Sequence, residues 1–319
     1  MTTVQTVETT RARSAGRGAP DRDRRRRVGN QTPPLTALGF LAPFLILYIL
    51  FIIGPALYGL LMSFFNTSLV KPGLGTFAGL DNYAEAFGSR EFWQSMWHTI
   101  YFALLTTPPL VILGLVFAWL AERATRGKAF FRVAFFTPYV LPSAVMALIW
   151  VWLYAPIIGL LTKFVTLIGL TAPGWLSDPH WAMPSLALAT VWWTLGFNFV
   201  LYLAGLGEIS RELYEAASID GASPLQQLRL ITLPLLARTT TLVAVLQFIA
   251  SLKVFDQMFI MTQGGPNYAT RSVLQYIYDS GFTDMRTGYA AAASTLFFIV
   301  VLIASAVWLV ITRRQNEES

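Results

Sequence analysis

One polar segment, residues 215–236 (EAASIDGASPLQQLRLITLPLL), stands out because it lies between two long apolar runs. Its acids, Glu215 and Asp220, stand beside small residues, which is a pattern suited to binding another protein. The chain has no Cys and two His, so thiolate chemistry, disulfides and Cys-based metal sites are excluded, and a site with several His is nearly so. We therefore predict no catalytic residues, no metal site and no cofactor.

The residues around this segment predict two short helices joined by a turn. Ser210 is a typical helix cap before strong helix formers, and Gly221 ends the first helix. Pro224 suits the first turn of a second helix, and Pro234 is expected to open the next apolar span. Two interpretations fit these residues. The helices insert into a groove of a partner, or they form an amphipathic loop that rests on lipid headgroups. The small residues available for a groove are Ala216, Ala217, Gly221 and Ala222.

The composition places these helices in a membrane protein. Hydrophobic residues make up 55% of the 319 residues, charged residues make up 13%, and the mean hydropathy is +0.55. A span of about 20 apolar residues crosses a bilayer as a helix. We therefore predict an all-α polytopic membrane protein with six transmembrane helices and a helix-turn-helix between the fourth and fifth. The expected spans are residues 38–64, 96–121, 130–154, 181–206, 236–262 and 287–312.

Basic residues set the expected orientation. The first 30 residues hold eight Arg and almost nothing apolar, so a disordered tail on the cytoplasmic side is predicted. The alternative is an arm that binds nucleic acid or protein. Six spans then place both termini in the cytoplasm. The expected organisation is a tail (1–35), a first transmembrane helix (36–65), an outer loop (66–95), a core domain of five helices (96–312) that includes the loop 207–235, and a cytoplasmic C-terminal tail (313–319).

The order Glu-Ala-Ala, two residues, Asp-Gly-Ala, then Ile-Thr-Leu-Pro-Leu-Leu closely resembles a known signature. It is similar to the cytoplasmic loop of permease subunits of ATP-binding-cassette importers, in the carbohydrate class related to maltose and glycerol-3-phosphate permeases. Leu228 departs from the pattern, because these permeases usually carry an aromatic residue there. Further matching segments are residues 79–83, Pro138, Pro142, 175–178, 254–257 and 262–266.

The resemblance implies a sugar importer in the bacterial plasma membrane, where the chain contacts lipid. Its implied partners are a second, non-identical permease subunit, a cytoplasmic ATPase dimer, an extracytoplasmic solute-binding protein and a sugar, with no nucleic acid. The chain has no Gly-x-x-x-x-Gly-Lys-Ser/Thr loop, in keeping with a non-catalytic subunit whose separate ATPase partner hydrolyses ATP. The residues implied to couple to that ATPase are Glu215, Ala216, Ala217, Asp220, Gly221, Ala222 and Pro234.

Polar and aromatic residues on the fourth and fifth spans are candidates for a sugar pathway, because sugars need hydrogen bonds and aromatic faces. Positions matching the family favour Gln247 and Ser251, whereas Trp193 and Asn198 are proposed from proximity alone. The alternative for the aromatic residues is packing or contact with lipid.

Two ionisable residues stand within the expected fifth span. Charges inside a span are costly, and the i, i+3 spacing of Lys253 and Asp256 would let them pair on one helix. Either they contact ligand, or they form a structural pair at the interface with the second permease subunit. Two other classes of protein are not favoured by the sequence. A secondary transporter would need a chain of acids at the midplane, and a membrane enzyme would need clustered carboxylates or His; neither pattern is present.

Overall fold

The computed structural model describes residues 34–71, 73–124 and 127–317 and divides the chain into two compact units, residues 1–55 and 56–319. Residues 1–33, most of the predicted arginine-rich tail, lie outside the described part. The first unit holds α1 (Pro34–Tyr48) and the π-helical turn η1 (Ile49–Ile53), and α2 (Gly54–Met62) follows. The stretch Gly39–Met62 is apolar enough to span a membrane, and its large side chains are mostly exposed, as expected of a helix that faces lipid.

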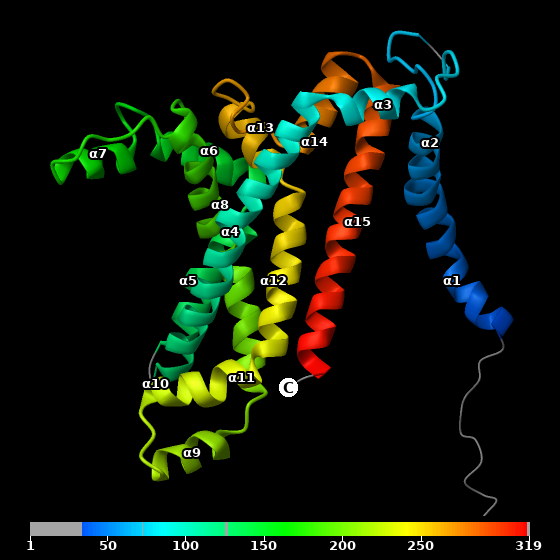
Figure 1. The fold of residues 1–319 in the computed structure, drawn as a ribbon. Coiled ribbons are helices and arrows are strands. Elements are labelled where there is room, and N and C mark those ends of the chain that lie inside the picture. Colours follow the sequence, from blue (N-terminus) through cyan, green and yellow to red (C-terminus); the bar gives the residue numbers. More distant parts are fainter. Residues whose placement is uncertain (1–33, 72, 125–126, 318–319) are drawn as a thin grey trace, which may run out of the picture. The chain divides into compact units, whose positions relative to one another are not determined.

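The second unit is built around two long helices, α4 and α8, which pack against each other (Figure 1). Helix α5 covers α8, and α12 packs against α4. The elements of this unit, in chain order, are α3 (Asp81–Gly88), α4 (Arg90–Arg123), α5 (Lys128–Val140), α6 (Ser143–Leu153), α7 (Leu160–Leu167), α8 (Pro179–Gly207), α9 (Arg211–Ile219), α10 (Pro224–Gln227), η2 (Leu228–Thr232), α11 (Leu233–Leu235), α12 (Ala237–Leu252), α13 (Asp256–Thr262), α14 (Val273–Tyr278), η3 (Asp279–Thr283) and α15 (Thr287–Glu317).

The predicted all-α class is confirmed. In the described part of the chain, four helices are long and apolar enough to cross a membrane, and counting two bent helix pairs as spans makes six. One pair is α5 with α6, bent by 97°, and the other joins Pro224–Leu235 to α12 with a bend of 68°. The number of actual crossings stays a prediction.

The expected fifth span, residues 236–262, is not one helix. Helix α12 ends at Leu252 and α13 begins at Asp256, because the backbone leaves the helical region at Phe255, where φ is −141° and ψ is −61°. A turn follows this region, since α13 ends at Thr262 and Gln263 adopts a left-handed conformation. Residues 253–255 therefore form a short irregular connection that the sequence pattern did not reveal.

A glycine lets α5 and α8 approach closely. A Cβ atom at Gly196 of α8 would lie 2.1 Å from the carbonyl oxygen of Phe135 on α5. Small residues at helix contacts allow this kind of backbone approach in membrane proteins. The aromatic rings of Phe135 and Phe199 then pack 5.1 Å apart on either side of the contact. Gly196 thus fixes the position of α5, which carries part of the site described below.

At the end of the unit opposite α9, two ion pairs tie α3 and the start of α4 to the segments that precede α15 and α14. Arg286 donates two hydrogen bonds to Glu85, at 2.8 and 2.6 Å, and holds the pKa of that carboxyl below its usual value. Arg271 is buried, donates to Glu91 at 3.1 Å and lies 4.1 Å from the ring centre of Tyr268. Helix α3 lies within the region that was predicted as the outer loop 66–95.

Candidate functional site

The segment 210–235, called the hairpin below, has the predicted helix-turn-helix structure. The Ser210 hydroxyl accepts a hydrogen bond from the backbone N–H of Glu212 and caps α9, as predicted. Gly221 follows α9 with φ of +79°, a left-handed conformation that glycine adopts without a Cβ penalty. The N–H of Ala222 then reaches back to the carbonyl of Ala217 at 2.8 Å, which closes the helix end.

The second half of the hairpin begins with a capping box. The Ser223 backbone N–H donates to the Gln226 side chain at 2.7 Å, and the Ser223 hydroxyl accepts from the Gln226 N–H, with Pro224 in the first turn as predicted. The chain then runs through η2 and α11 before α12. Pro234 lies within α11 and not at the start of the next span, because a 68° bend follows it.

The two halves of the hairpin are fastened to each other by side chains. The hydroxyls of Tyr214 and Thr232 lie 2.9 Å apart, and the Gln227 amide donates to the Ser218 hydroxyl at 2.9 Å. Gln227 and Thr232 are buried, so one partner of each hydrogen bond is shielded from water. The hairpin is therefore a cross-braced unit and not a flexible loop.

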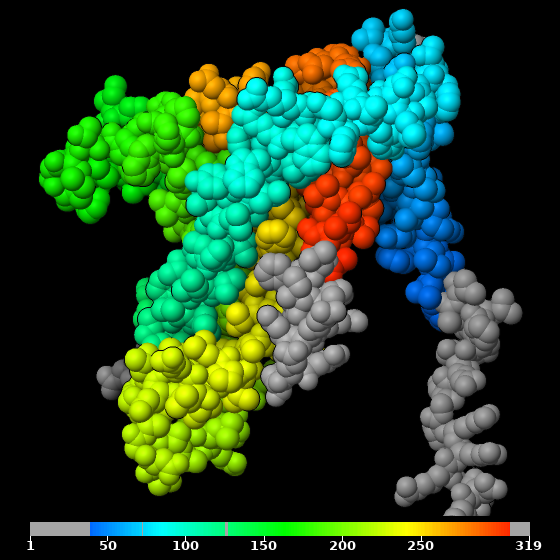
Figure 2. Space-filling view, in the orientation of Figure 1, coloured from blue at the N-terminus to red at the C-terminus, as the bar shows by residue number. Residues whose placement is uncertain are grey.

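The outer surface of the hairpin combines free acids with exposed apolar side chains. Glu215 and Asp220 are exposed, and no side chain in the described part of the chain forms an ion pair with either. Ile219 is 87% exposed and Leu225 is 68% exposed. Ala216 and Gly221 are exposed beside them, whereas Ala217 and Ala222 are partly buried. Figure 2 shows α9 and α10 protruding beyond the end of α4.

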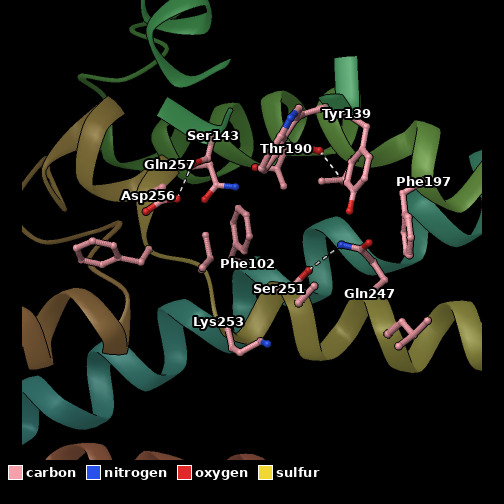
Figure 3. Close-up of a pocket in the computed structure, with 16 residues that line it drawn as sticks. Phe102, Tyr139, Ser143, Thr190, Phe197, Gln247, Ser251, Lys253, Asp256 and Gln257 are labelled. Carbon is pink, nitrogen blue, oxygen red and sulfur yellow. Dashed lines mark hydrogen bonds between the residues drawn. The ribbon is translucent and has the colours of Figure 1, made fainter. Parts of the chain in front are cut away.

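A second feature is a cavity of about 350 Å³ among α4, α5, α6, α8, α12 and α13, called the central cavity below (Figure 3). Five of the six predicted pathway residues line it: Trp193, Gln247, Ser251, Lys253 and Asp256. The sixth, Asn198, is fully buried behind the wall and donates to the Gln247 side-chain oxygen at 3.3 Å. The structure therefore brings together residues from the two spans that the sequence singled out.

A chain of hydrogen bonds crosses the wall of this cavity. The Gln247 amide donates to the Ser251 hydroxyl at 3.3 Å, and the Ser251 hydroxyl lies 2.9 Å from that of Thr106 on α4. All three side chains are buried in an apolar surrounding, where each polar group needs a partner. The arrangement holds the amide and the hydroxyl of α12 in fixed positions at the surface of the cavity.

The sharp bend between α5 and α6 supplies residues that the sequence analysis missed. Leu141 adopts an extended conformation before Pro142, which turns the chain and frees the Leu141 carbonyl. Trp193 satisfies that carbonyl with its indole N–H at 3.1 Å, so it has a structural role as well as a place in the cavity. Tyr139 stacks on Phe197 with ring centres 5.3 Å apart. The sequence signal for the bend was the prolines that flank it. Their spacing does not show which side chains at the bend face the cavity.

Lys253 and Asp256 do not share one helix, so the i, i+3 pairing that their spacing would allow is not formed. Lys253 lies in the irregular connection and Asp256 begins α13, and no ion pair joins them among the described residues. Asp256 instead accepts a hydrogen bond from the Ser143 hydroxyl at 2.5 Å, across the bend of α5 and α6 (Figure 3). Lys253 is exposed at the edge of the central cavity. The cavity can thus offer hydroxyl, amide, carboxylate and ammonium groups beside aromatic rings.

Comparison with known proteins identifies the family. Residues 111–316 match the family described as "Binding-protein-dependent transport system inner membrane component". The chain is 32% identical over 282 residues to the sulfoquinovosyl glycerol transport system permease protein SmoG of Agrobacterium fabrum, covering 88% of this chain and 92% of that protein. It is 35% identical over 238 residues to the trehalose/maltose transport system permease protein MalF of Thermococcus litoralis, covering 74% and 80%.

Solved structures of ABC transporters also resemble this chain. The chain resembles a crystal structure of a bacterial ABC transporter involved in the import of the acidic polysaccharide alginate, with a TM-score of 0.77 and 25% identity over 88% of this chain and 96% of that one. A second match, with a TM-score of 0.76, is the alginate transporter in complex with its alginate pentasaccharide-bound periplasmic protein. The chain therefore belongs to the family of inner-membrane components of binding-protein-dependent transport systems. It is the membrane-spanning permease subunit of an ABC importer, and the resemblance found in the sequence is confirmed.

Proposed function

We propose that this permease, together with a second, non-identical permease subunit, forms the pathway for a sugar or oligosaccharide across the inner membrane. The central cavity supports this proposal, because it combines hydrogen-bonding groups with the aromatic faces of Tyr139, Trp193 and Phe197. Relatives are named for trehalose and maltose, for sn-glycerol 3-phosphate and for sulfoquinovosyl glycerol. We assign Gln247, Ser251, Lys253 and Asp256 to contacts with this cargo, and Asn198 to the support of Gln247.

We further propose that the hairpin docks into a cytoplasmic ATPase dimer. The observation that carries this proposal is the exposure of unpaired Glu215 and Asp220 next to the apolar side chains of Ile219 and Leu225. Such a surface is complementary to a groove with an apolar floor and a basic rim. This assignment puts residues 1–35, 207–235 and 313–319 in the cytoplasm and residues 66–95 outside, where a solute-binding protein delivers the sugar.

The mechanism follows from the rigidity of the hairpin. Closure of the ATPase dimer on ATP moves a docked element, and the cross-braced hairpin transmits that movement as one body. The hairpin continues into α12 through the bend at Leu236, and α12 carries Gln247 and Ser251. Movement of the hairpin therefore reaches the wall of the central cavity and switches its access from the outside to the inside.

Co-purification of the ATPase with the permease tests the docking proposal. Replacing Glu215 with Lys reverses the charge that faces the expected basic group, so we expect about a tenfold or greater loss of ATPase in the purified complex. Glu212→Lys is the matched control, because Glu212 is an exposed acid in the first turn of the same helix. Equal recovery of ATPase with both variants and with the unmodified permease would contradict the docking of the hairpin.

Uptake into proteoliposomes tests the transport proposal. The probe is the saccharide that most raises the melting temperature of the associated binding protein, chosen from neutral and acidic sugars. Gln247→Leu removes the amide from the cavity and leaves Asn198 without its partner, so we expect uptake to fall while the amount of complex in the membrane is retained. Unchanged uptake by this variant would exclude Gln247 from the pathway.

A further inference from the structure

A side chain at the end of α4 holds the hairpin. The Arg123 guanidinium donates to the Gln227 side-chain oxygen at 3.1 Å and reaches the Pro224 carbonyl oxygen at 3.4 Å. Among the described residues, every hydrogen bond between α4 and the hairpin comes from Arg123. A cavity of about 380 Å³ adjoins this contact, lined by residues of α4, α8 and the hairpin.

Arg123 is held in place on its own helix. Its guanidinium lies 4.6 Å from the centre of the Trp119 ring, one turn earlier in α4. This stacking fixes a side chain that would otherwise sample many rotamers, and the planar guanidinium keeps its remaining N–H groups free to donate. A basic residue in the last turn of a helix is also favoured by the helix dipole.

Gln227 is the complementary part of the contact. It is buried, it accepts from Arg123, and it donates to Ser218 of α9 and to the Ala222 carbonyl. One amide therefore connects α4 with both helices of the hairpin. Movement of α9 reaches Arg123 through Gln227, and movement of α10 reaches it through Gln227 and the Pro224 carbonyl.

Helix α4 carries the connection onward to the central cavity. Arg123 and Thr106 lie on one continuous helix, separated by about 25 Å at 1.5 Å rise per residue. Thr106 contacts Ser251 in the cavity wall, and Phe102, one turn further along α4, lines the cavity. The hairpin thus has two routes to the cavity, one through α12 and one through α4.

We propose that Arg123 and Gln227 form a strut that makes α4 move together with the hairpin, so that both walls of the cavity shift when the ATPase closes. Arg123 is in this sense a positioning residue for transport. The strut rests on the proposed docking of the hairpin. Its experimental signature is a fixed distance between α4 and the hairpin in the open and closed states of the ATPase.

Spin-label distances test the strut, and the absence of native Cys makes the labelling clean. Labels go on Cys introduced at Ile112 of α4 and Leu230 of the hairpin, both exposed. The complex with its ATPase is measured in nanodiscs without nucleotide and after trapping with ATP and vanadate. We expect the same distance in both states. With Arg123→Ala, we expect the distance to differ between the two states.

Two further variants distinguish the loss of the strut from a general loss of protein stability. The exchange of the partners, Arg123→Gln with Gln227→Arg, is expected to restore the fixed distance, because the contact is re-formed with donor and acceptor reversed. Lys128→Ala is the control, since it removes the neighbouring surface pair with Glu122 and leaves the strut intact. A purely structural role of Arg123 would lower the melting temperature without making the distance depend on nucleotide.

A second label pair distinguishes failure of the strut from failure of the docking proposal. Labels at Leu167, in α7, and Leu230 report whether the hairpin moves at all when ATP and vanadate bind, because α7 packs against α6 and not against α4. If this distance changes while Arg123→Ala leaves the Ile112–Leu230 distance fixed, the strut alone is refuted. If the hairpin stays immobile relative to Leu167, the docking proposal and the strut both fail. Uptake per ATP hydrolysed should fall about tenfold in Arg123→Ala and recover in the exchanged pair.

Discussion

The hydroxyl oxygens of Thr106 on α4 and Ser251 on α12 lie 2.9 Å apart in the buried wall of the central cavity. Thr106 also donates to the carbonyl of Phe102 on its own helix, at 2.9 Å. Ser251 in turn accepts from Gln247, so the pair joins a helix contact to the polar surface of the cavity.

Replacement of Ser251 tests this arrangement. Ser251→Ala leaves the Gln247 amide without an acceptor in an apolar surrounding, which we expect to lower the free energy of unfolding by about 1–3 kcal/mol and to reduce uptake. Ser251→Thr keeps the hydroxyl and is expected to retain more uptake. Thermal unfolding in detergent and uptake in proteoliposomes are the measurements. An alanine variant with unchanged stability and uptake would show that the hydrogen-bond chain is dispensable.

The turn of the hairpin predicts the order in which variants at Gly221 lose stability. No atom lies within 4 Å of the position where a Cβ would stand, so the requirement for glycine comes from the backbone φ of +79° alone. Gly221→Ala should therefore cost about 1–2 kcal/mol, whereas Gly221→Asn should cost less, since Asn tolerates left-handed conformations. Melting of the purified permease and recovery of the ATPase check this order. Equal effects of Ala and Asn would argue against a backbone origin.

The contact between α5 and α8 predicts a steric effect at Gly196. A methyl group there would collide with the backbone at Phe135, and the helices can relieve the collision only by separating. We expect Gly196→Ala to destabilise the protein by about 1–3 kcal/mol. Gly207→Ala is the control at the end of the same helix, because its Cβ would meet no atom within 4 Å. Comparable melting temperatures for the two variants would contradict the close contact.

The pair of Glu85 and Arg286 predicts a loss of stability in acid. Arg286 holds the pKa of Glu85 below its usual value of 4.5, so the folded state binds this proton less readily than the unfolded state. The contribution of the pair is fully present above pH 4.5 and is lost as the pH falls through the lower pKa of the folded state. Because both side chains are about half exposed, the effect should be about 1 kcal/mol or less.

Melting temperatures of the unmodified protein and of Glu85→Gln, compared at decreasing pH, measure this contribution. The difference between them should shrink in acid. Asp279→Asn is a control of opposite sign, because burial raises the pKa of Asp279 and makes its charged form unfavourable. The unmodified protein should therefore gain stability relative to Asp279→Asn as the pH falls. A difference for Glu85→Gln that does not depend on pH would show that the pair does not contribute.

Local features of the sequence were enough to predict the hairpin. Ser210, Gly221 and Pro224 each act on backbone groups within a few residues of themselves, so their types specify a cap, a left-handed turn and a helix start. The apolar composition was enough to predict an all-α membrane protein, because about 20 apolar residues are needed to cross a bilayer as a helix, but it did not reveal the breaks within the third and fifth expected spans. The family signature in residues 215–236 fixed the transport class before any tertiary contact was known.

Only the tertiary structure decided how the sites are assembled. The break between Leu252 and Asp256 separates Lys253 from Asp256, and the 97° bend of α5 and α6 brings Ser143 to Asp256 from more than a hundred residues away. Arg123 reaches Gln227 across a similar separation in sequence. Contacts of this kind depend on the directions in which whole helices run, and the residue types along one helix carry no information on where another helix passes. The sequence therefore determines which elements form, and the packing of α4, α5, α8 and α12 determines which side chains meet.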